Sequence, residues 1–253
     1  MTDDLDGKVA IVTGGARGIG AATARAFVRA GARVVIGDVN ERGLDAMAGE
    51  LGSAVRTCRA DITTEAGVAG LVEEAVDTFG RLDILHNNAA FVVNEDVDVV
   101  STTDAAWRTT FDFTVMAVVW GLRHGIPAMV ASGGGSIVNM SSGASVIASA
   151  VKAAYGSCKA AIETLTMYTA AQCGTDGIRC NAVQPGFVLT EGIREVFSEE
   201  HQREVAAGAA LGRICTPEDV ADVVLWLASS ASGYVNGQVI PVNGGGQKPT
   251  TAW

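Results

Sequence analysis

The amino-acid sequence predicts a single α/β domain, built as a doubly wound parallel sheet with helices on both faces. Short apolar runs rich in Val and Ile alternate with longer stretches of helical length. This alternation is typical of strands that are buried on both faces of a parallel sheet. The chain has 253 residues, 48% hydrophobic and 18% charged, so one large core is available. No repeat, linker or low-complexity block divides it, and the expected domain covers 1–253.

Seven runs have the composition of strands. KVAIVT and RVVIGD are nearly continuous apolar runs, whereas AVRTCRA is the weakest of the set. In chain order, the expected strands are 8–13, 33–38, 54–60, 81–87, 135–141, 177–183 and 237–243. Parallel strands need crossover connections of a dozen or more residues, and right-handed crossovers place helices on both faces of the sheet.

Six stretches between these strands have the length and pattern of helices. In chain order, the expected helices are 18–31, 41–51, 64–79, 104–130, 153–174 and 217–229. The last start is well signalled, because Thr216 is a good N-cap, Pro217 follows it, and two acidic residues come next. The stretch 187–213 has no clear place in the sheet. In such a fold it lies beyond the carboxyl end of a strand, where ligands bind, so we expect a substrate lid there.

The composition argues against several classes of function. With 18 basic and 28 acidic residues, the formal charge is −10, which disfavours nucleic acid or an anionic membrane as a partner. The five cysteines form no CxxC pair and the three histidines show no ligand spacing, so no metal site is expected. Scattered thiols indicate a reducing, cytoplasmic compartment. The acidic N-terminus and the lack of an apolar run of transmembrane length predict neither a signal peptide nor a membrane span.

A glycine-rich turn joins the first expected strand to the first expected helix. In TGGARGIG, at 13–20, Gly14, Gly18 and Gly20 let the backbone turn tightly and approach a ligand; Arg17 and Ile19 lie in the same turn. The helix N-terminus offers free N–H groups and a positive dipole end to a pyrophosphate. The spacing is GxxxGxG rather than GxGxxG, and a turn without a ligand is the alternative. The flanking strand and helix favour a Rossmann-like dinucleotide site.

Asp38 ends the second expected strand. A carboxylate there can accept hydrogen bonds from both hydroxyls of the adenosine ribose and would repel a 2′-phosphate. Val39 follows, so no cation offsets this repulsion, and Arg17 is the one feature that favours NADP. The sequence therefore favours NAD as the cofactor over NADP. A helix N-cap or a turn residue is the alternative role for Asp38.

Tyr155 and Lys159 stand four residues apart in AAYGSCKAA, so on a helix they share one face. The small residues around them leave room for a large ligand against that face. A fixed ammonium nearby favours the phenolate and lowers the pKa of a tyrosine. The alternative is a surface helix with a half-buried Tyr and a snorkelling Lys.

Five motifs occur in one order along the chain: TGGARGIG, HNNAA, NMSS, YGSCK and QPGFVLT. Together, on an alternating β/α pattern, they resemble the short-chain dehydrogenase/reductase family from residue 5 to 246. The resemblance implies that Tyr155 is the catalytic acid/base and that Lys159 binds the nicotinamide ribose and lowers the phenol pKa. It also implies that Ser142 hydrogen-bonds the substrate oxygen. Ser141 would point the other way, because neighbouring side chains on a strand alternate.

The resemblance implies contacts to the adenosine half of the cofactor. Asp61 matches an acid that contacts the adenine, and Ile62 would flank the ring. Asn88 and Ala89 belong to NNAA, where the family usually has NNAG. Ala90 therefore replaces a glycine, which costs about 1 kcal/mol if the position needs a positive φ.

The resemblance places the nicotinamide half near QPGFVLT. Pro185 and Gly186 resemble the turn beside the nicotinamide, and Val188 and Thr190 would contact its carboxamide. The stretch VNGGG, at 242–246, resembles a C-terminal strand and loop that often pack across a subunit interface. The tail QKPTTAW is expected to be either a disordered end or a cap on a neighbour's pocket.

One position departs from the family pattern. The family usually has an asparagine seven residues after a tryptophan, and here Trp107 leads to Thr114. In the family this residue helps to hold a water that links the lysine to a proton path, largely through its backbone carbonyl, which Thr retains. A Thr hydroxyl can also bond back into its helix. We therefore interpret Thr114 as a softened version of this catalytic position.

The resulting hypothesis is hydride transfer between NAD(H) and a secondary alcohol or ketone. Apolar candidates for the pocket wall favour an apolar or cyclic substrate; they are Phe91, Val92, Ala144, Val146 and Phe187. The alternatives are an NADPH-dependent ketoreductase, which Asp38 disfavours, and a non-catalytic NAD-binding scaffold, which the intact Ser142, Tyr155 and Lys159 disfavour. The resemblance also implies a homotetramer, formed through the two long helices at 104–130 and 153–174.

Overall fold

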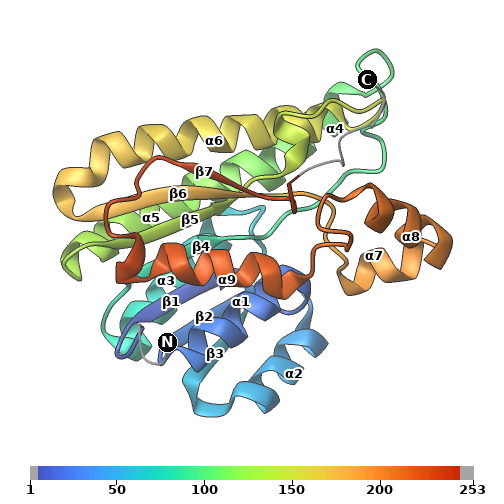
Figure 1. Cartoon of the computed structure of the whole chain (residues 1–253). Helices are drawn as coiled ribbons and strands as arrows, with labels where there is room; N and C mark the ends of the chain where they lie inside the picture. The colour runs from blue at the N-terminus through green and yellow to red at the C-terminus, as the bar shows by residue number, and fades with distance from the viewer. Residues whose placement is uncertain (1–4, 246–253) are drawn as a thin grey trace.

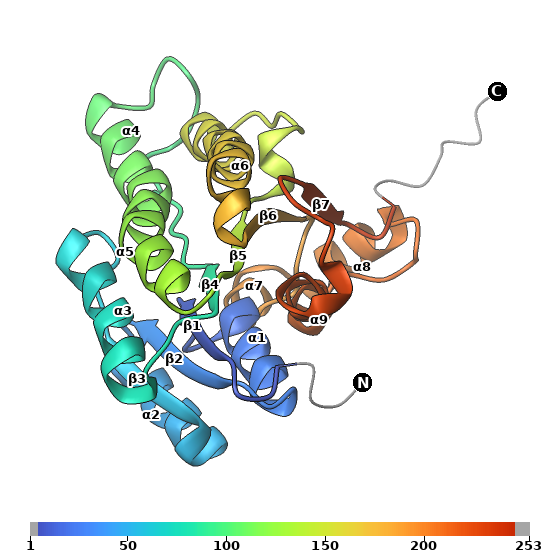
Figure 2. The same ribbon diagram turned by 90° about the vertical axis from the view of Figure 1, so that its left-hand side faces the viewer.

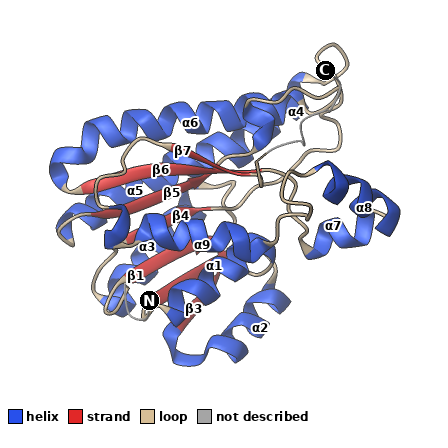
Figure 3. Ribbon diagram, in the orientation of Figure 1, coloured by secondary structure: helices blue, strands red, loops and turns tan. Residues whose placement is uncertain are grey.

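The computed structural model describes residues 5–245 and arranges seven strands in one parallel sheet (Figures 1 and 3). The strands are β1 Val9–Thr13, β2 Arg33–Asp38, β3 Val55–Arg59, β4 Ile84–Asn87, β5 Gly135–Met140, β6 Ile178–Pro185 and β7 Val239–Val242. Their order in the sheet is β3-β2-β1-β4-β5-β6-β7. Since β1 lies between β2 and β4, the winding reverses beside it, and a crevice forms at the carboxyl ends of these strands. The predicted doubly wound fold is confirmed.

Helices cover both faces of this sheet (Figure 2). The helices are α1 Gly18–Arg29, α2 Glu41–Leu51, α3 Glu65–Phe79, α4 Asp104–Phe111, α5 Ala117–Ala131, α6 Ala153–Cys173, α7 Glu191–Val196, α8 Glu199–Gly208 and α9 Pro217–Ala228. Alternate residues of each strand enter two cores, as period-2 strands require. On β1, Ala10 and Val12 belong to the core with α1, α2 and α9. Val9 and Ile11 belong to the core with α3, α5 and α6.

Three predicted strand boundaries differ by two or more residues, among them the start of β7, at Val239 rather than at 237. β4 begins at Ile84 rather than at 81, because the buried Asp83 ends the preceding loop. Its carboxylate accepts hydrogen bonds from the Val9 N–H and from Arg81 and Lys8. β6 continues to Pro185 rather than ending at 183, because β7 pairs with it up to that residue. The longer strand carries its last residues to the edge of the crevice.

The predicted helix at 104–130 is divided. Between α4 and α5, residues Asp112–Met116 form a π-helical turn, which inserts an extra residue into the helix. The combined run Asp104–Ala131 is long and apolar enough to cross a membrane by length and composition, since an 18-residue window within it has a mean hydropathy of 1.3. The sequence had predicted no such run. Core helices pass the same test, and α5 packs against the sheet and α3. We interpret the run as a helix that covers the sheet.

The stretch 187–213 contains two helices that the sequence did not predict, α7 and α8. Their caps are local, because the side chains of Thr190 and Ser198 accept hydrogen bonds from Ile193 N–H and His201 N–H. One bridge, Val188 to Cys215, ties the base of this stretch to the body. The two helices stand beyond the carboxyl ends of the strands (Figure 1). The tail QKPTTAW lies outside the described residues.

Candidate active site

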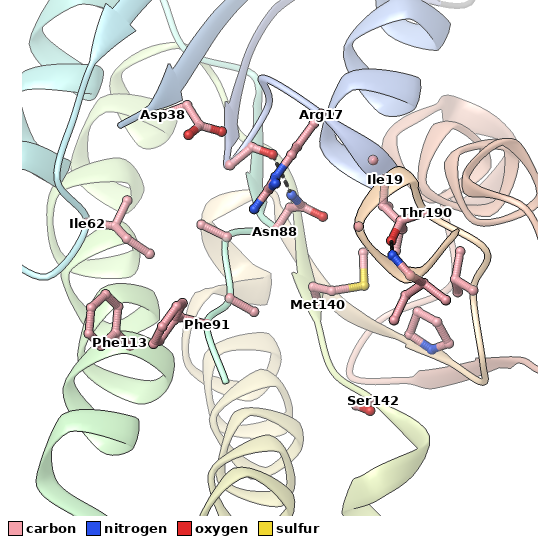
Figure 4. A pocket seen from close by; sticks show the side chains of 18 of the residues that line it. Arg17, Ile19, Asp38, Ile62, Asn88, Phe91, Phe113, Met140, Ser142 and Thr190 are labelled. Atoms are coloured by element: carbon pink, nitrogen blue, oxygen red, sulfur yellow. Dashed lines mark hydrogen bonds between the residues drawn. The ribbon is translucent and has the colours of Figure 1, made fainter. Parts of the chain in front are cut away.

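A cavity of about 570 Å³ opens at the carboxyl ends of the strands (Figure 4). The sequence-predicted site residues that line it are Gly14, Arg17, Gly18, Ile19, Asp38, Asp61, Ile62, Asn88, Ala89, Ser142, Tyr155, Lys159, Pro185, Gly186, Val188 and Thr190. Only Gly20 and Thr114 of the predicted set lie outside the lining. Residues far apart in sequence therefore meet in one place, beside the strand at which the winding reverses.

The glycine loop connects β1 to α1 through a tight turn that has little room for side chains. Gly18 has φ of 57°, a left-handed conformation that glycine adopts at the lowest cost. A Cβ on Gly20 would collide with the carbonyl oxygen of Gly14 and lie 2.7 Å from Nδ2 of Asn88. Gly20 therefore acts from behind the cavity, where it lets α1 pack against the loop and against Asn88. The amide of Asn88 in turn donates to the carbonyl oxygens of Thr13 and Gly14.

The N-terminus of α1 can accept an anion. Arg17 stands at the N-cap without a capping side-chain hydrogen bond, and the first turn has no acidic residue. The N–H of Gly18 donates to a carboxylate oxygen of Glu191 from α7, at 3.2 Å. An anionic group thus already sits where the dipole of α1 favours one. The donor set fits the pyrophosphate of a dinucleotide.

Asp38 is fixed at the end of β2. Its Oδ2 accepts from the N–H of Ala16, and its Oδ1 accepts from the N–H of Asn40, both at 3.0 Å. The carboxylate therefore joins the glycine loop to the turn after β2 while lining the cavity. Arg17 lines the same end of the cavity (Figure 4).

An aromatic pair stands near Ile62 (Figure 4). The rings of Phe91 and Phe113 lie 5.2 Å apart and are tilted by 37°. Asp61, on the same side, accepts hydrogen bonds from the side chain and the backbone of Thr63, which hold the pKa of its carboxyl below the usual value. Sequence reasoning missed Phe113, because the π-helical turn that aims it into the cavity leaves no trace in the hydrophobic pattern.

Lys159 is enclosed by protein. Its side chain is 1% exposed, and Nζ donates to the carbonyl oxygen of Met140 at 2.6 Å. Burial lowers the pKa of Lys159 to about 8. Nζ lies 5.6 Å from the centre of the Tyr155 ring.

Burial also raises the pKa of Tyr155, and the neighbouring Ser142 side chain only partly opposes that rise. In the protein alone, the net pKa of Tyr155 therefore lies above its ordinary value, and the lowering by Lys159 stays a prediction for the complex with the cofactor. Desolvation disfavours the phenolate more than the surrounding groups favour it.

The two serines of NMSS point in different directions. The hydroxyl of Ser141 donates to a carboxylate oxygen of Glu163 at 2.6 Å and lies 3.3 Å from the carbonyl oxygen of Lys159. The hydroxyl of Ser142 accepts from the N–H of Ala144 and lies at the cavity beside Tyr155. Ser142 is thus the serine that is free to meet a ligand.

Thr114 lies within the π-helical turn and is 1% exposed. Its hydroxyl has no hydrogen-bond partner among the described residues, so it does not bond back into the helix. Thr110, one turn earlier, does make such a bond, to the carbonyl oxygen of Ala106. The difference arises because the wider π turn moves the carbonyls away from the positions of a regular helix. Ala90 has no positive φ, so the replacement of glycine there costs little.

A family model described as enoyl-(acyl carrier protein) reductase matches residues 14–247 of the chain. The chain belongs to the short-chain dehydrogenase/reductase family. It is 38% identical over 241 residues to cis-4-hydroxycyclohexanecarboxylate dehydrogenase of Sinomonas cyclohexanicum, covering 94% of this chain and 96% of the relative. It is 37% identical to 3-alpha-(or 20-beta)-hydroxysteroid dehydrogenase of Mycobacterium bovis, covering 97% of this chain and 91% of the relative.

A solved structure has the same fold. It is 7 alpha-hydroxysteroid dehydrogenase complexed with NADH and 7-oxo glycochenodeoxycholic acid, with a TM-score of 0.91 and 31% identity. The match covers 98% of this chain and 99% of that one. This short-chain dehydrogenase/reductase is therefore an oxidoreductase acting on CH–OH groups, and the predicted family and activity are confirmed.

Proposed function

We propose that this enzyme transfers a hydride between NAD(H) and a secondary alcohol or ketone on an apolar, cyclic compound. One observation carries the proposal. Ser142, Tyr155 and Lys159 line the same cavity as Asp38 and the glycine loop. A single ligand can therefore contact the adenosine-binding end and the proton-transferring end together.

We assign NAD to this cavity because of Asp38. Gly18 and Ile19 would hold the pyrophosphate at the N-terminus of α1, and Asp38 would accept the ribose hydroxyls. Asp61, Ile62, Asn88 and Ala89 would surround the adenosine half. Pro185, Gly186, Val188 and Thr190 would surround the nicotinamide half. When bound, the cofactor supplies the carbon that accepts or returns the hydride.

The proton chemistry belongs to Tyr155. In alcohol oxidation its phenolate would take the hydroxyl proton, and in ketone reduction the phenol would return one. Ser142 would donate a hydrogen bond to the substrate oxygen and stabilise its alkoxide character. The buried ammonium of Lys159 would hold the nicotinamide ribose. A bound cationic ring and a nearby ammonium both favour the phenolate, opposing the effect of burial.

The substrate class rests on apolar walls and on the relatives. Of the wall residues predicted from the sequence, Phe91 lines the cavity, whereas Phe187 packs its ring on Phe197 at 5.4 Å in the 187–213 stretch. The relatives named above act, by their names, on a hydroxycyclohexane carboxylate and on hydroxysteroids. These names support a ring-bearing alcohol. The stretch 187–213 would be the lid over it, because Thr190 and Ile193 from this stretch line the cavity.

A second candidate, an NADPH-dependent ketoreductase, is favoured by one observation. Arg17 lines the adenosine end of the cavity, where a 2′-phosphate would need a cation. A 3-oxoacyl-[acyl-carrier-protein] reductase of Thermotoga maritima is 34% identical to the chain.

Steady-state rates with NAD and NADP decide between the candidates. If the enzyme is specific for NAD, Asp38→Ser should improve turnover with NADP. Arg17→Ser should leave turnover with NAD largely intact. A wild-type enzyme that prefers NADP overturns the assignment of NAD.

The activity test is absorbance at the reduced-nicotinamide band with a panel of cyclic, steroidal and acyclic secondary alcohols. Tyr155→Phe should remove nearly all turnover and keep NADH binding, measured by fluorescence. The matched control is Tyr168→Phe, since Tyr168 is exposed on the same helix. If Tyr155→Phe keeps its turnover, or loses NADH binding along with it, Tyr155 is a structural residue and the proposed mechanism fails.

We also propose a homotetramer in the cytoplasm. The support for the homotetramer is a groove between α4 and α6, on the two helical runs expected to form subunit contacts. It has a volume of about 480 Å³ and is lined by Trp107, Arg108, Phe111, Asp112, Ser157, Cys158 and Ala161.

A further inference from the structure

Asp96 is a buried carboxylate that binds the start of the catalytic helix. It lies in the loop between β4 and α4, and 2% of it is exposed. Its Oδ1 accepts from the N–H of Ala154 at 3.1 Å, and its Oδ2 accepts from the N–H of Tyr155 at 2.8 Å. No salt bridge joins it to a cation within 5–245. The whole charge therefore faces two backbone donors of α6.

The helix needs this external cap because it has no cap of its own. Lys152 occupies the N-cap position with φ of 69°, the one positive φ at a non-glycine residue in the described chain, and makes no side-chain cap. Most other helices carry a local cap, such as Asn40 for α2 and Thr216 for α9. At α6, a residue 58 positions away in sequence replaces the local cap.

The same contact joins two parts of the site. Asp96 lies six residues after Ala90, in the middle of the loop that begins with the NNAA motif. The N–H of Lys152 donates to the carbonyl oxygen of Val97 at 2.9 Å, so the loop holds the helix start at a second point. The segment that leads from the adenosine-binding residues is thus fastened to the backbone of Tyr155.

We propose that Asp96 is a positioning residue for catalysis, a role that rests on the proposed function of Tyr155. It fixes the backbone of Tyr155 and thereby the place of the phenol relative to Ser142 and Lys159. An ionised acceptor suits this task, because the N-terminus of a 21-residue helix carries positive partial charge. Hydrogen bonds to a charged acceptor are also stronger than those to a neutral one.

The test compares Asp96→Asn with Asp98→Asn. Asp98 is an exposed residue of the same loop, and it too accepts two backbone N–H groups, those of Val100 and Ser101. Asparagine keeps one acceptor oxygen at position 96 but turns an NH₂ group toward the other N–H. We expect kcat to fall by about tenfold to a hundredfold, since misplacement of a reacting group by about 1 Å has such effects. The dissociation constant of NADH should stay within about twofold, and Asp98→Asn should change both quantities by no more than about twofold.

Three outcomes overturn the inference: an unchanged kcat in Asp96→Asn, a parallel loss of NADH binding, or an equal loss in Asp98→Asn. If Asp96→Asn does not fold, Asp96→Ser supplies a short neutral cap in its place and is judged by the same criteria. A wild-type enzyme that turns over no alcohol or ketone in the panel refutes the proposed function instead. The two failures are therefore distinguishable.

Discussion

His86 places an imidazole inside the sheet, where burial changes its pKa. It is fully buried on β4, where Nδ1 lies 2.9 Å from the carbonyl oxygen of Val138 and Nε2 has no partner among the described residues. Burial lowers the pKa of His86 to about 4. The ring is therefore neutral in the folded protein at neutral pH, and a neutral ring is the form that an unpaired buried nitrogen tolerates.

His86 should make the free energy of unfolding depend on pH in the acidic range. The unfolded chain binds a proton at His86 near its ordinary pKa of about 6.5, whereas the folded protein does so only near pH 4. Within this window the unfolded state binds more protons, so stability falls as the pH falls. The expected loss from pH 6.5 to pH 4 is roughly 3 kcal/mol.

Urea unfolding at several pH values checks this prediction. In His86→Val, this part of the acid dependence should vanish, although the changed core alters the stability at neutral pH. His201→Gln is the control, because the His201 side chain is 44% exposed and should leave the slope as in the wild type. A His86→Val slope identical to that of the wild type refutes the prediction.

At the scale of elements, α7 and α1 share one contact that competes with a cofactor. Glu191, the first residue of α7, accepts from the N–H of Gly18 at the N-terminus of α1. A pyrophosphate needs the same positive end of the helix. Glu191→Gln should therefore tighten NADH binding by about two- to fivefold, the size of a charge effect at a helix end.

Fluorescence titration with NADH measures this effect at low and high salt. The gain should shrink at high salt, because screening weakens a contact between partly exposed charges. Glu195→Gln is the matched control, since Glu195 is an exposed residue of the same helix. Unchanged or weaker binding in Glu191→Gln would mean that the carboxylate does not compete.

Local sequence signals decide which helices and strands could be predicted. The strands and α1 were predictable because their period and the glycine turn are local signals. α7 and α8 carried local signals too, Thr190 before Glu191 and Ser198 before two acids, but such short helices have little periodicity. The π-helical turn was not predictable, since the apolar pattern of 104–130 runs through it unbroken.

The features of the site that could not be predicted from the sequence depend mostly on contacts between distant segments. Most predicted site residues share one cavity because each follows the end of a strand or starts a helix, and the fold gathers those ends. Asp96 gave no signal, since its partners lie 58 and 59 residues away. The effect of burial on the Tyr155 pKa gave no signal either, because no local motif reports burial.

At the scale of the whole molecule, one apolar face, on the helical run Asp104–Ala131, is only partly buried. Only 39% of the apolar window within Asp104–Ala131 is buried. Phe111, at the groove between α4 and α6, is 43% exposed. In the proposed homotetramer, a second copy covers this groove.

Ala161→Arg tests the assembly, because it adds a charge and bulk to the groove wall on α6. Burying an unpaired charge at an interface is costly, so the variant should elute as a smaller species than the wild type in size-exclusion chromatography with light scattering. NADH binding should persist, because Ala161 does not line the cofactor cavity. Ala66→Arg, on the exposed side of α3, is the control and should assemble like the wild type. An Ala161→Arg protein that keeps the wild-type mass places the subunit contacts on another face of the molecule.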